Sequence, residues 1–135
     1  MAQPSERERG AAGIYPRRVG IDAYGNGGFR FGDTSHRGSL LCVPGGMLAW
    51  PVESAADLTM ESLKPVFDAA DEIDVLLIGL GNDIVAMDPA IRQALRDRQV
   101  IVEAVQTGGA VRTYNVLLAE ERAVAAALIA VENAR

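Results

Sequence analysis

The sequence has little of the side-chain chemistry on which most metal sites and many catalytic sites depend. Its 135 residues include one cysteine, Cys42, and one histidine, His36. A single cysteine excludes an intramolecular disulfide framework and a cysteine-rich zinc site. A single histidine excludes a cluster of histidine ligands. The composition therefore removes several classes of enzyme from consideration, and it predicts neither a metal site nor a cofactor.

Positive charge is also scarce. The chain carries 13 Lys and Arg against 18 Asp and Glu, for a formal net charge of −5. This balance argues against non-specific binding to nucleic acid, which depends on surface cations that neutralise phosphates. Six Arg against four acids give residues 1–50 a net charge of +2, and seven Lys or Arg against fourteen acids give residues 51–135 a net charge of −7. If one surface meets a partner, the acidic half is the first place to look.

Long apolar runs are absent as well. No stretch approaches the roughly 18–20 apolar residues of a membrane-spanning helix, so we expect no span, while peripheral membrane association stays open. Residues 1–13 lack the apolar core of a secretory signal, and Glu6 and Glu8 are atypical of a mitochondrial transit peptide. These features predict a cytoplasmic bacterial protein. With 49% hydrophobic residues, we expect a flexible segment at 1–13, one domain at 14–131 and a C-terminal tail at 132–135.

The first half of the domain carries strand signals. Apolar and polar residues alternate from residue 18 to residue 23, glycines follow at 24–28, and alternation resumes at 29–31. This pattern predicts a β-hairpin. The other expected elements of this half are a polar loop at 32–38 and short strands at 39–43 and 47–50.

The second half alternates between strand and helix signals. Ser62 is a plausible helix N-cap, because it places Pro65 at the third helical position, where the missing N–H breaks no bond. Asp88 followed by Pro89 is a strong helix start, and Arg92, Arg96 and Arg98 point outward from that helix. The remaining expected elements are a buried strand at 75–79, a strand at 100–105, a helix at 110–121, and an element at 123–130 that composition alone leaves open between helix and strand. The alternation predicts an α/β fold with parallel strands, right-handed helical crossovers and a covered central sheet.

A glycine pair after the buried strand is the first candidate binding motif. Gly79 and Gly81 could form a tight turn that exposes backbone N–H groups to a pyrophosphate. The third glycine of a dinucleotide-binding motif is replaced by Ile84, and the carboxylate of Asp88 at the next helix start would repel a phosphate. A simple strand-ending turn is therefore the favoured interpretation.

Residues with catalytic potential are isolated from the partners that they would need. Asp83 and Asp88 are five positions apart, and Asp22 and Asp33 flank the hairpin, but neither spacing matches a known cation-binding loop. We interpret these acids as solvated or capping residues. His36 is expected in an exposed loop, and Cys42 is expected as a small buried hydrophobic residue.

A polar triplet marks the third expected helix. Thr113, Tyr114 and Asn115 are mediocre helix formers, and three consecutive residues cannot share one helix face. Asn115 and the later Glu120 both need polar partners. A structural network that joins helix, loop and strand is favoured over a ligand site, and both remain open.

Four segments of the chain resemble a known family, the mitochondrial complex I assembly factor three family. They are GNGGFRFG at 25–32, IGLG at 78–81, VEAVQTGGAVRTYNVLLAEER at 102–122 and AAALI at 125–129. Bacterial and archaeal relatives of this family are small single-domain proteins of unassigned function. The positions that match its pattern are Gly79, Gly81, Thr107, Ala110, Thr113, Tyr114, Asn115, Glu120 and Arg122. The chain departs from that pattern at Leu80, where such relatives often have Thr, and at Glu121, where they often have Gly.

The resemblance implies a three-layer single domain. In this fold a mixed central sheet has helical crossovers and an additional β-rich N-terminal layer packed beside it. The resemblance also implies that the chain after Glu121 and Arg122 returns as a strand antiparallel to its neighbours. It brings no catalytic residues, because none are established for the family.

Two functions follow as hypotheses. The first is a non-enzymatic scaffold or assembly-factor-like protein that binds a protein partner and is linked to respiratory complex I assembly. The second is a domain that binds a small molecule or nucleotide through the turn at 79–81 and the turn at 107–109, which could meet at one end of parallel strands. The candidate binding residues are Gly79, Gly81, Asn82, Asp83, Thr107, Thr113, Tyr114, Asn115 and Glu120. No particular oligomeric state is predicted.

Overall fold

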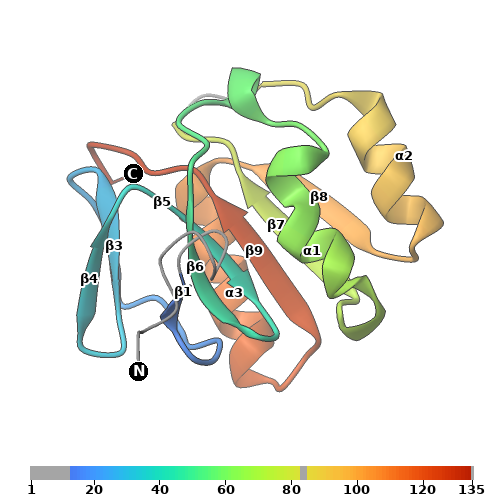
Figure 1. Ribbon diagram of the computed structural model, residues 1–135. Coiled ribbons are helices and arrows are strands. Elements are labelled where there is room, and N and C mark those ends of the chain that lie inside the picture. The colour runs from blue at the N-terminus through green and yellow to red at the C-terminus, as the bar shows by residue number, and fades with distance from the viewer. Residues whose placement is uncertain (1–12, 83–84, 135) are drawn as a thin grey trace, which may run out of the picture.

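The chain folds around a six-stranded mixed sheet, with a three-stranded sheet at one side (Figure 1). The computed structural model describes residues 13–82 and 85–134. The strands are β1 (Gly13–Tyr15), β2 (Ala23–Gly25), β3 (Gly28–Phe31), β4 (Thr34–Arg37), β5 (Ser39–Val43), β6 (Gly46–Trp50), β7 (Val75–Gly79), β8 (Ile101–Val105) and β9 (Val124–Leu128). The helices are α1 (Lys64–Asp68), α2 (Pro89–Asp97) and α3 (Thr107–Ala119), with short 3₁₀ turns at Ala55–Asp57, Glu61–Leu63 and Ala70–Glu72.

Chain topology explains the three layers. The large sheet has the order β1-β6-β5-β9-β7-β8, and β7 is parallel to both of its neighbours. The connection through α2 runs outward from β7 to β8, and the connection through α3 runs back past β7 to β9. Because such crossovers are right-handed, opposite directions place the two helices on opposite faces of the sheet. Figure 1 shows α1 and α2 on one face and α3 on the other. The predicted three-layer α/β fold with a mixed sheet is confirmed.

Each face of the large sheet has its own hydrophobic core. One core packs α1 and α2 against the sheet around Leu63, Leu76 and Leu95. The other packs α3 and the three-stranded sheet around Phe31 and Tyr114. The β-rich N-terminal layer is therefore held to the sheet through buried aromatic side chains.

The predicted hairpin is present, but it extends further along the chain than the prediction. Its first turn is Asn26-Gly27, with φ of 53° and 77°, and its second is Gly32-Asp33, with φ of 49° and 63°. Positive φ at both central residues is typical of the two-residue turns that connect antiparallel strands. The polar loop expected at 32–38 is wrong, because Thr34–Arg37 forms β4. An edge strand can be polar throughout, so its composition resembles that of a loop.

Residues 18–22 were expected to be a strand, and that prediction is also wrong. The ladder between β2 and β3 begins only at Ala23, which pairs with Arg30. Backbone groups of Val19 and Ile21 bond instead to side chains of α3. The segment is extended because a helix, rather than another strand, satisfies its backbone.

The helix boundaries follow the sequence signals only in part. Asp88 caps α2 as predicted, since its carboxylate accepts from the Ala90 N–H at 2.8 Å. The predicted N-cap at Ser62 is wrong: a 3₁₀ turn precedes α1, and Ser62 forms reciprocal hydrogen bonds with Thr59. Helix α3 begins at Thr107, three residues before the predicted start. Within residues 13–82 and 85–134, no helix has the length and apolar character needed to cross a bilayer.

The element at 123–130 is a strand, β9, as the family resemblance implies. Its predicted orientation is only half right. Strand β9 is antiparallel to β5 but parallel to β7. The parallel pairing arises because the crossover through α3 returns the chain in the direction of β8. The flexible segment expected at 1–13 lies, apart from Gly13 in β1, outside the described residues.

Candidate functional site

Thr107 joins the ends of three elements at the carboxyl edge of the parallel strands. Its hydroxyl donates to Ile129 O at 2.7 Å and accepts from the Gly81 N–H at 3.0 Å. Its own N–H donates to Gly81 O at 2.9 Å. The side chain is fully buried. One hydroxyl thus ties the turn after β7 and the segment after β9 to the first residue of α3.

Gly79 is required by the same packing. A Cβ at this position would lie 2.8 Å from Thr107 Cα, which is closer than real side chains approach. Gly81 has a φ of +89°, a conformation that favours glycine, and its N–H is bonded to Thr107. The turns at 79–81 and 107–109 do meet at one end of the sheet, as the sequence suggested. They meet by packing and internal hydrogen bonds, however, and this geometry offers no support for a phosphate cradle.

Asn82 continues this cluster toward the surface. Its backbone carbonyl accepts from the Gln106 side chain, and its side-chain amide donates to Asn133 O at 3.3 Å. Asp83 and Ile84 lie outside the described residues. Four of the candidate positions, Gly79, Gly81, Asn82 and Thr107, therefore form one cluster, which links strand ends through the chain's own backbone.

Tyr114 and Asn115 form a second cluster on α3. The Tyr114 hydroxyl donates to Val19 O at 2.8 Å. The Asn115 side chain accepts from the Ile21 N–H at 2.8 Å and donates to Ile21 O at 2.9 Å, as a neighbouring strand would. These bonds attach the extended segment at 18–22 to the core. The geometry is that of a structural network between helix and strand region.

Burial suppresses the acid–base chemistry of the titratable groups at this cluster. Cys42 is fully buried, as predicted, and desolvation raises the pKa of its thiol from 9.0 to about 12. Desolvation also raises the pKa of Tyr114 well above its ordinary value, with a further contribution from Cys42. Both groups are therefore neutral at physiological pH and lack the character of a nucleophile or a base.

The remaining candidates lie apart from both clusters. Thr113 is half-buried on α3, and Glu120 is exposed at the C-terminal end of that helix. Asp22 and Asp33 are exposed at the three-stranded sheet. The prediction of an exposed loop for His36 is wrong: it lies in β4, half-buried, with Nε2 at 3.0 Å from Ser39 O. Among the residues that the structure describes, no group of three or more His, Cys, Asp or Glu could hold a metal ion.

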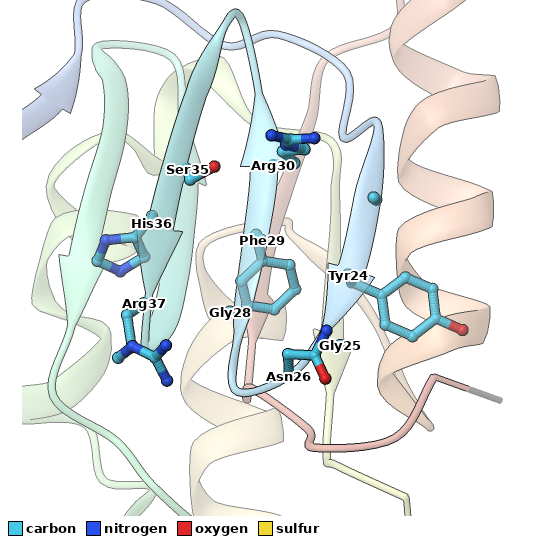
Figure 2. Close-up of a pocket in the computed structure, with 10 residues that line it drawn as sticks. Tyr24, Gly25, Asn26, Gly28, Phe29, Arg30, Ser35, His36 and Arg37 are labelled. Carbon is cyan, nitrogen blue, oxygen red and sulfur yellow. The ribbon is translucent and has the colours of Figure 1, made fainter.

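A hollow of about 510 Å³ lies on the three-stranded sheet, and sequence reasoning missed it (Figure 2). Figure 2 shows Arg30 and Ser35 toward one end and Arg37 and Asn26 toward the other. Arg30 and Arg37 are exposed and give the hollow positive charge. Its lining residues are Ala23, Tyr24, Gly25, Asn26, Gly28, Phe29, Arg30, Ser35, His36 and Arg37. The pairing of Arg30 with Ser35 and of Gly28 with Arg37 brings these residues together, and the only signal in the sequence was the hairpin.

Comparison with known proteins places the chain in a family. A family model described as "Protein of unknown function (DUF498/DUF598)" matches residues 21–129. This match spans both clusters and the hairpin. The chain belongs to this family.

Two relatives of this chain come from a bacterium and from a vertebrate. An uncharacterized protein of Rhodobacter capsulatus is 37% identical over 123 residues, which cover 91% of this chain and 90% of that protein. The "NADH dehydrogenase [ubiquinone] 1 alpha subcomplex assembly factor 3" of Xenopus tropicalis is 34% identical over 109 residues. Those residues cover 81% of this chain but only 60% of the assembly factor. The family resemblance that the motifs indicated is thus confirmed.

A solved structure supports the same assignment. The crystal structure of a protein described as an outer membrane protein from Bartonella henselae matches with a TM-score of 0.85 and 47% sequence identity. The match covers 88% of this chain and 100% of that one. The fold described above is therefore found in an experimentally determined relative.

Proposed function

We propose that this protein is a non-enzymatic assembly factor that binds other proteins during the assembly of respiratory complex I. The observation that carries the proposal is the 34% identity to the Xenopus assembly factor across 81% of this chain. The shared region is the folded domain itself, since the family match runs from residue 21 to residue 129. A role performed by this domain in the relative is therefore a role that this chain has the structure to perform.

The geometry of the motif supports a structural rather than catalytic use of its polar groups. Thr107, Tyr114 and Asn115 all bond to the chain's own backbone. None of these bonds is directed into the hollow on the three-stranded sheet. We propose that binding takes place on the surface of the domain, in the cytoplasm, with peripheral access to the membrane where complex I is assembled.

Deletion of the gene in its source organism tests the proposal. We expect the deletion strain to contain less assembled complex I on native gels, to accumulate subcomplexes, and to lose NADH:ubiquinone oxidoreductase activity in its membranes. The wild-type gene should restore all three. An unchanged complex in the deletion strain would contradict the assembly role, and repeated affinity purifications without any protein partner would contradict protein binding.

A second measurement addresses nucleotide binding. Thermal-shift assays with nucleotides and dinucleotides are expected to show no saturable stabilisation, because the Gly81 N–H is already bonded to Thr107. A saturable shift that Gly81→Val abolished would favour the nucleotide-binding function instead.

Cell fractionation tests the location, since recovery only in an integral membrane fraction would contradict a peripheral protein.

A further inference from the structure

Within the part of the chain that the structure describes, β8 is one of the two edge strands of the six-stranded sheet, and it lies beside α2 (Figure 1). The Ile101 N–H donates to Asp74 O at 2.9 Å, and Val105 O accepts a bond from the residue that follows β7. Residues 101, 103 and 105 therefore direct their backbone polar groups toward β7. Because these groups alternate along a strand, the N–H and C=O groups of Val102 and Ala104 point away from the sheet.

An arginine of α2 forms a hydrogen bond with one of these outward backbone groups. Arg92 Nη1 donates to Val102 O at 3.1 Å, where the N–H of a seventh strand would donate. Arg92 and Arg96, one turn apart on α2, line a hollow of about 290 Å³ beside Val100, Ile101 and Val102. A strand that took over the bond to Val102 O would release the Arg92 guanidinium for a carboxylate.

The other face of this edge carries three exposed apolar side chains. Ile101 is 63% exposed, Val105 is 36% exposed and Val116 of α3 is 56% exposed. A Cβ at Gly109 would lie 3.6 Å from Val105, so this side of α3 faces β8, and Val116 is two turns further along the same side. We call Ile101, Val105 and Val116 the β8 strip. Glu103 lies between Ile101 and Val105 on the same face of the strand.

We propose that the outer edge of β8 binds an extended segment of a partner protein as a seventh strand. The side chains of this bound segment are alternately acidic, facing Arg92 and Arg96, and apolar, facing the β8 strip. In this mode of recognition the backbone ladder supplies affinity, and pockets for alternate side chains supply specificity. The inference rests on the proposed function and deepens it, because it names the surface and the chemistry of the segment that is bound.

A second copy of the chain fits this edge less well than an acidic segment. Antiparallel self-pairing centred on Val102 would bring Arg92 close to its counterpart. Self-pairing centred on Glu103 would place two carboxylates directly opposite each other. Like charges in these positions destabilise a strand pair, whereas an acidic segment meets the arginines with opposite charge.

A palindromic peptide tests the proposal, because it presents the same alternation in either strand direction. The probe is fluorescein-labelled, amidated Ser-Val-Glu-Thr-Glu-Val-Ser, in which Thr lies opposite Glu103, and the control peptide has Lys in place of both Glu. Ala104→Pro removes an outward N–H that none of the described strands uses, and a sheet edge tolerates proline at such a position. Arg92→Glu combined with Arg96→Glu reverses the charge. The matched control is Arg30→Glu combined with Arg37→Glu, which makes the same charge change on the three-stranded sheet.

Fluorescence anisotropy should show that the full chain binds the acidic peptide and not the lysine peptide. We expect each edge variant to weaken binding by about tenfold or more, and the matched control to change it by less than about twofold. Thermal melts identify any edge variant that fails to fold, and the charge-reversal variant then carries the test without the proline. Absence of binding to the acidic peptide, or equal weakening in the matched control, would overturn the inference.

Two further outcomes separate this inference from the proposed function. If sedimentation shows a dimer that Ala104→Pro dissociates, a second copy covers the edge and the acidic-segment inference is wrong. If a partner copurifies equally with wild type and with both edge variants, protein binding stands and the assignment to β8 is wrong. If the peptide binds at the edge but deletion leaves complex I unchanged, the assembly role fails and the edge assignment stands.

Discussion

Glu121 adopts a backbone conformation that glycine would adopt at lower free energy. It follows α3 with a φ of +61°. Its N–H donates to Leu118 O at 2.9 Å, and the Arg122 N–H donates to Leu117 O at 3.0 Å. These two bonds form the helix-ending motif in which the first residue beyond the cap is left-handed and is most often glycine. We predict that Glu121→Gly stabilises the protein.

The magnitude follows from three contributions. The left-handed conformation disfavours a residue with a Cβ by roughly 1–2 kcal/mol. This stabilisation is reduced by about 0.5–1 kcal/mol, because glycine loses more conformational entropy on folding than a residue with a side chain. Removing a carboxylate from the negative end of a helix adds about 0.3–1 kcal/mol. The net expectation for Glu121→Gly is a stabilisation of about 1 kcal/mol, or a rise in Tm of about 4 °C for a domain of this size.

Urea unfolding measures this change, with the fluorescence of the single, buried Trp50 as the signal. Glu121→Ala is the matched comparison, because it removes the same charge and keeps the unfavourable backbone conformation. Glu120→Gly is the negative control, since φ at Glu120 is −87° and glycine gains nothing there. The reasoning is refuted if Glu121→Gly is no more stable than Glu121→Ala.

Three further predictions concern buried positions. Thr107→Val should lower the free energy of unfolding by about 2–3 kcal/mol in urea titrations, because it removes two buried hydrogen bonds. The control, Thr113→Val, should change the free energy of unfolding by less than about 0.5 kcal/mol. Equal effects of the two variants would contradict the role of the Thr107 hydroxyl. Gly79→Ala should lower Tm, because the new Cβ would collide with Thr107 and destabilise the fold by about 1–3 kcal/mol. The control, Gly45→Ala, should leave Tm unchanged, because a Cβ at Gly45 would meet no atom within 4 Å. An unchanged Tm of Gly79→Ala would contradict the packing argument. Stability should fall as pH rises above the ordinary thiol pKa of 9.0, because the unfolded Cys42 thiol ionises there while the buried one stays protonated up to about pH 12. The free energy of unfolding should fall by at most about 1.4 kcal/mol per pH unit. If a Cys42→Ala variant lost stability at the same rate between about pH 8 and pH 9.5, ionisation of Cys42 would not be the cause.

The parts of the fold that could be predicted are those with a local cause. The apolar run at 75–79 indicates a buried strand by its composition alone, and the Asp88 carboxylate caps α2 by accepting from the N–H two residues along the chain. The missed parts have distant or ambiguous causes. Strand β4 is a polar edge strand in which Ser35 and Arg37 are exposed, and α3 begins at Thr107, whose hydroxyl bonds to Ile129, 22 residues later.

The candidate site also has a part that the sequence could predict and a part that it could not. That Tyr114 and Asn115 need polar partners was evident from their place in a helix. Their partners, Val19 and Ile21, are more than 90 residues away, so the sequence could not identify them. The free edge of β8 was equally hidden, because only the strand order reveals that no strand among residues 13–82 and 85–134 lies beyond it.

Three of the positions that carry the family resemblance hold the fold together, so the effect of a substitution on stability can be separated from its effect on binding. Thr107, Tyr114 and Asn115 attach distant backbone segments, so their substitution should reduce stability and, as the folded fraction falls, partner binding with it. Arg92 donates one part-buried bond, to Val102 O only ten residues away, so substitution of Arg92 and Arg96 should weaken binding at a small cost in stability. Under the proposed binding at β8, the motif would keep the scaffold of this chain while the β8 edge selects the segment that it binds. Motif variants that lost binding without losing stability would show instead that the motif itself contacts the partner.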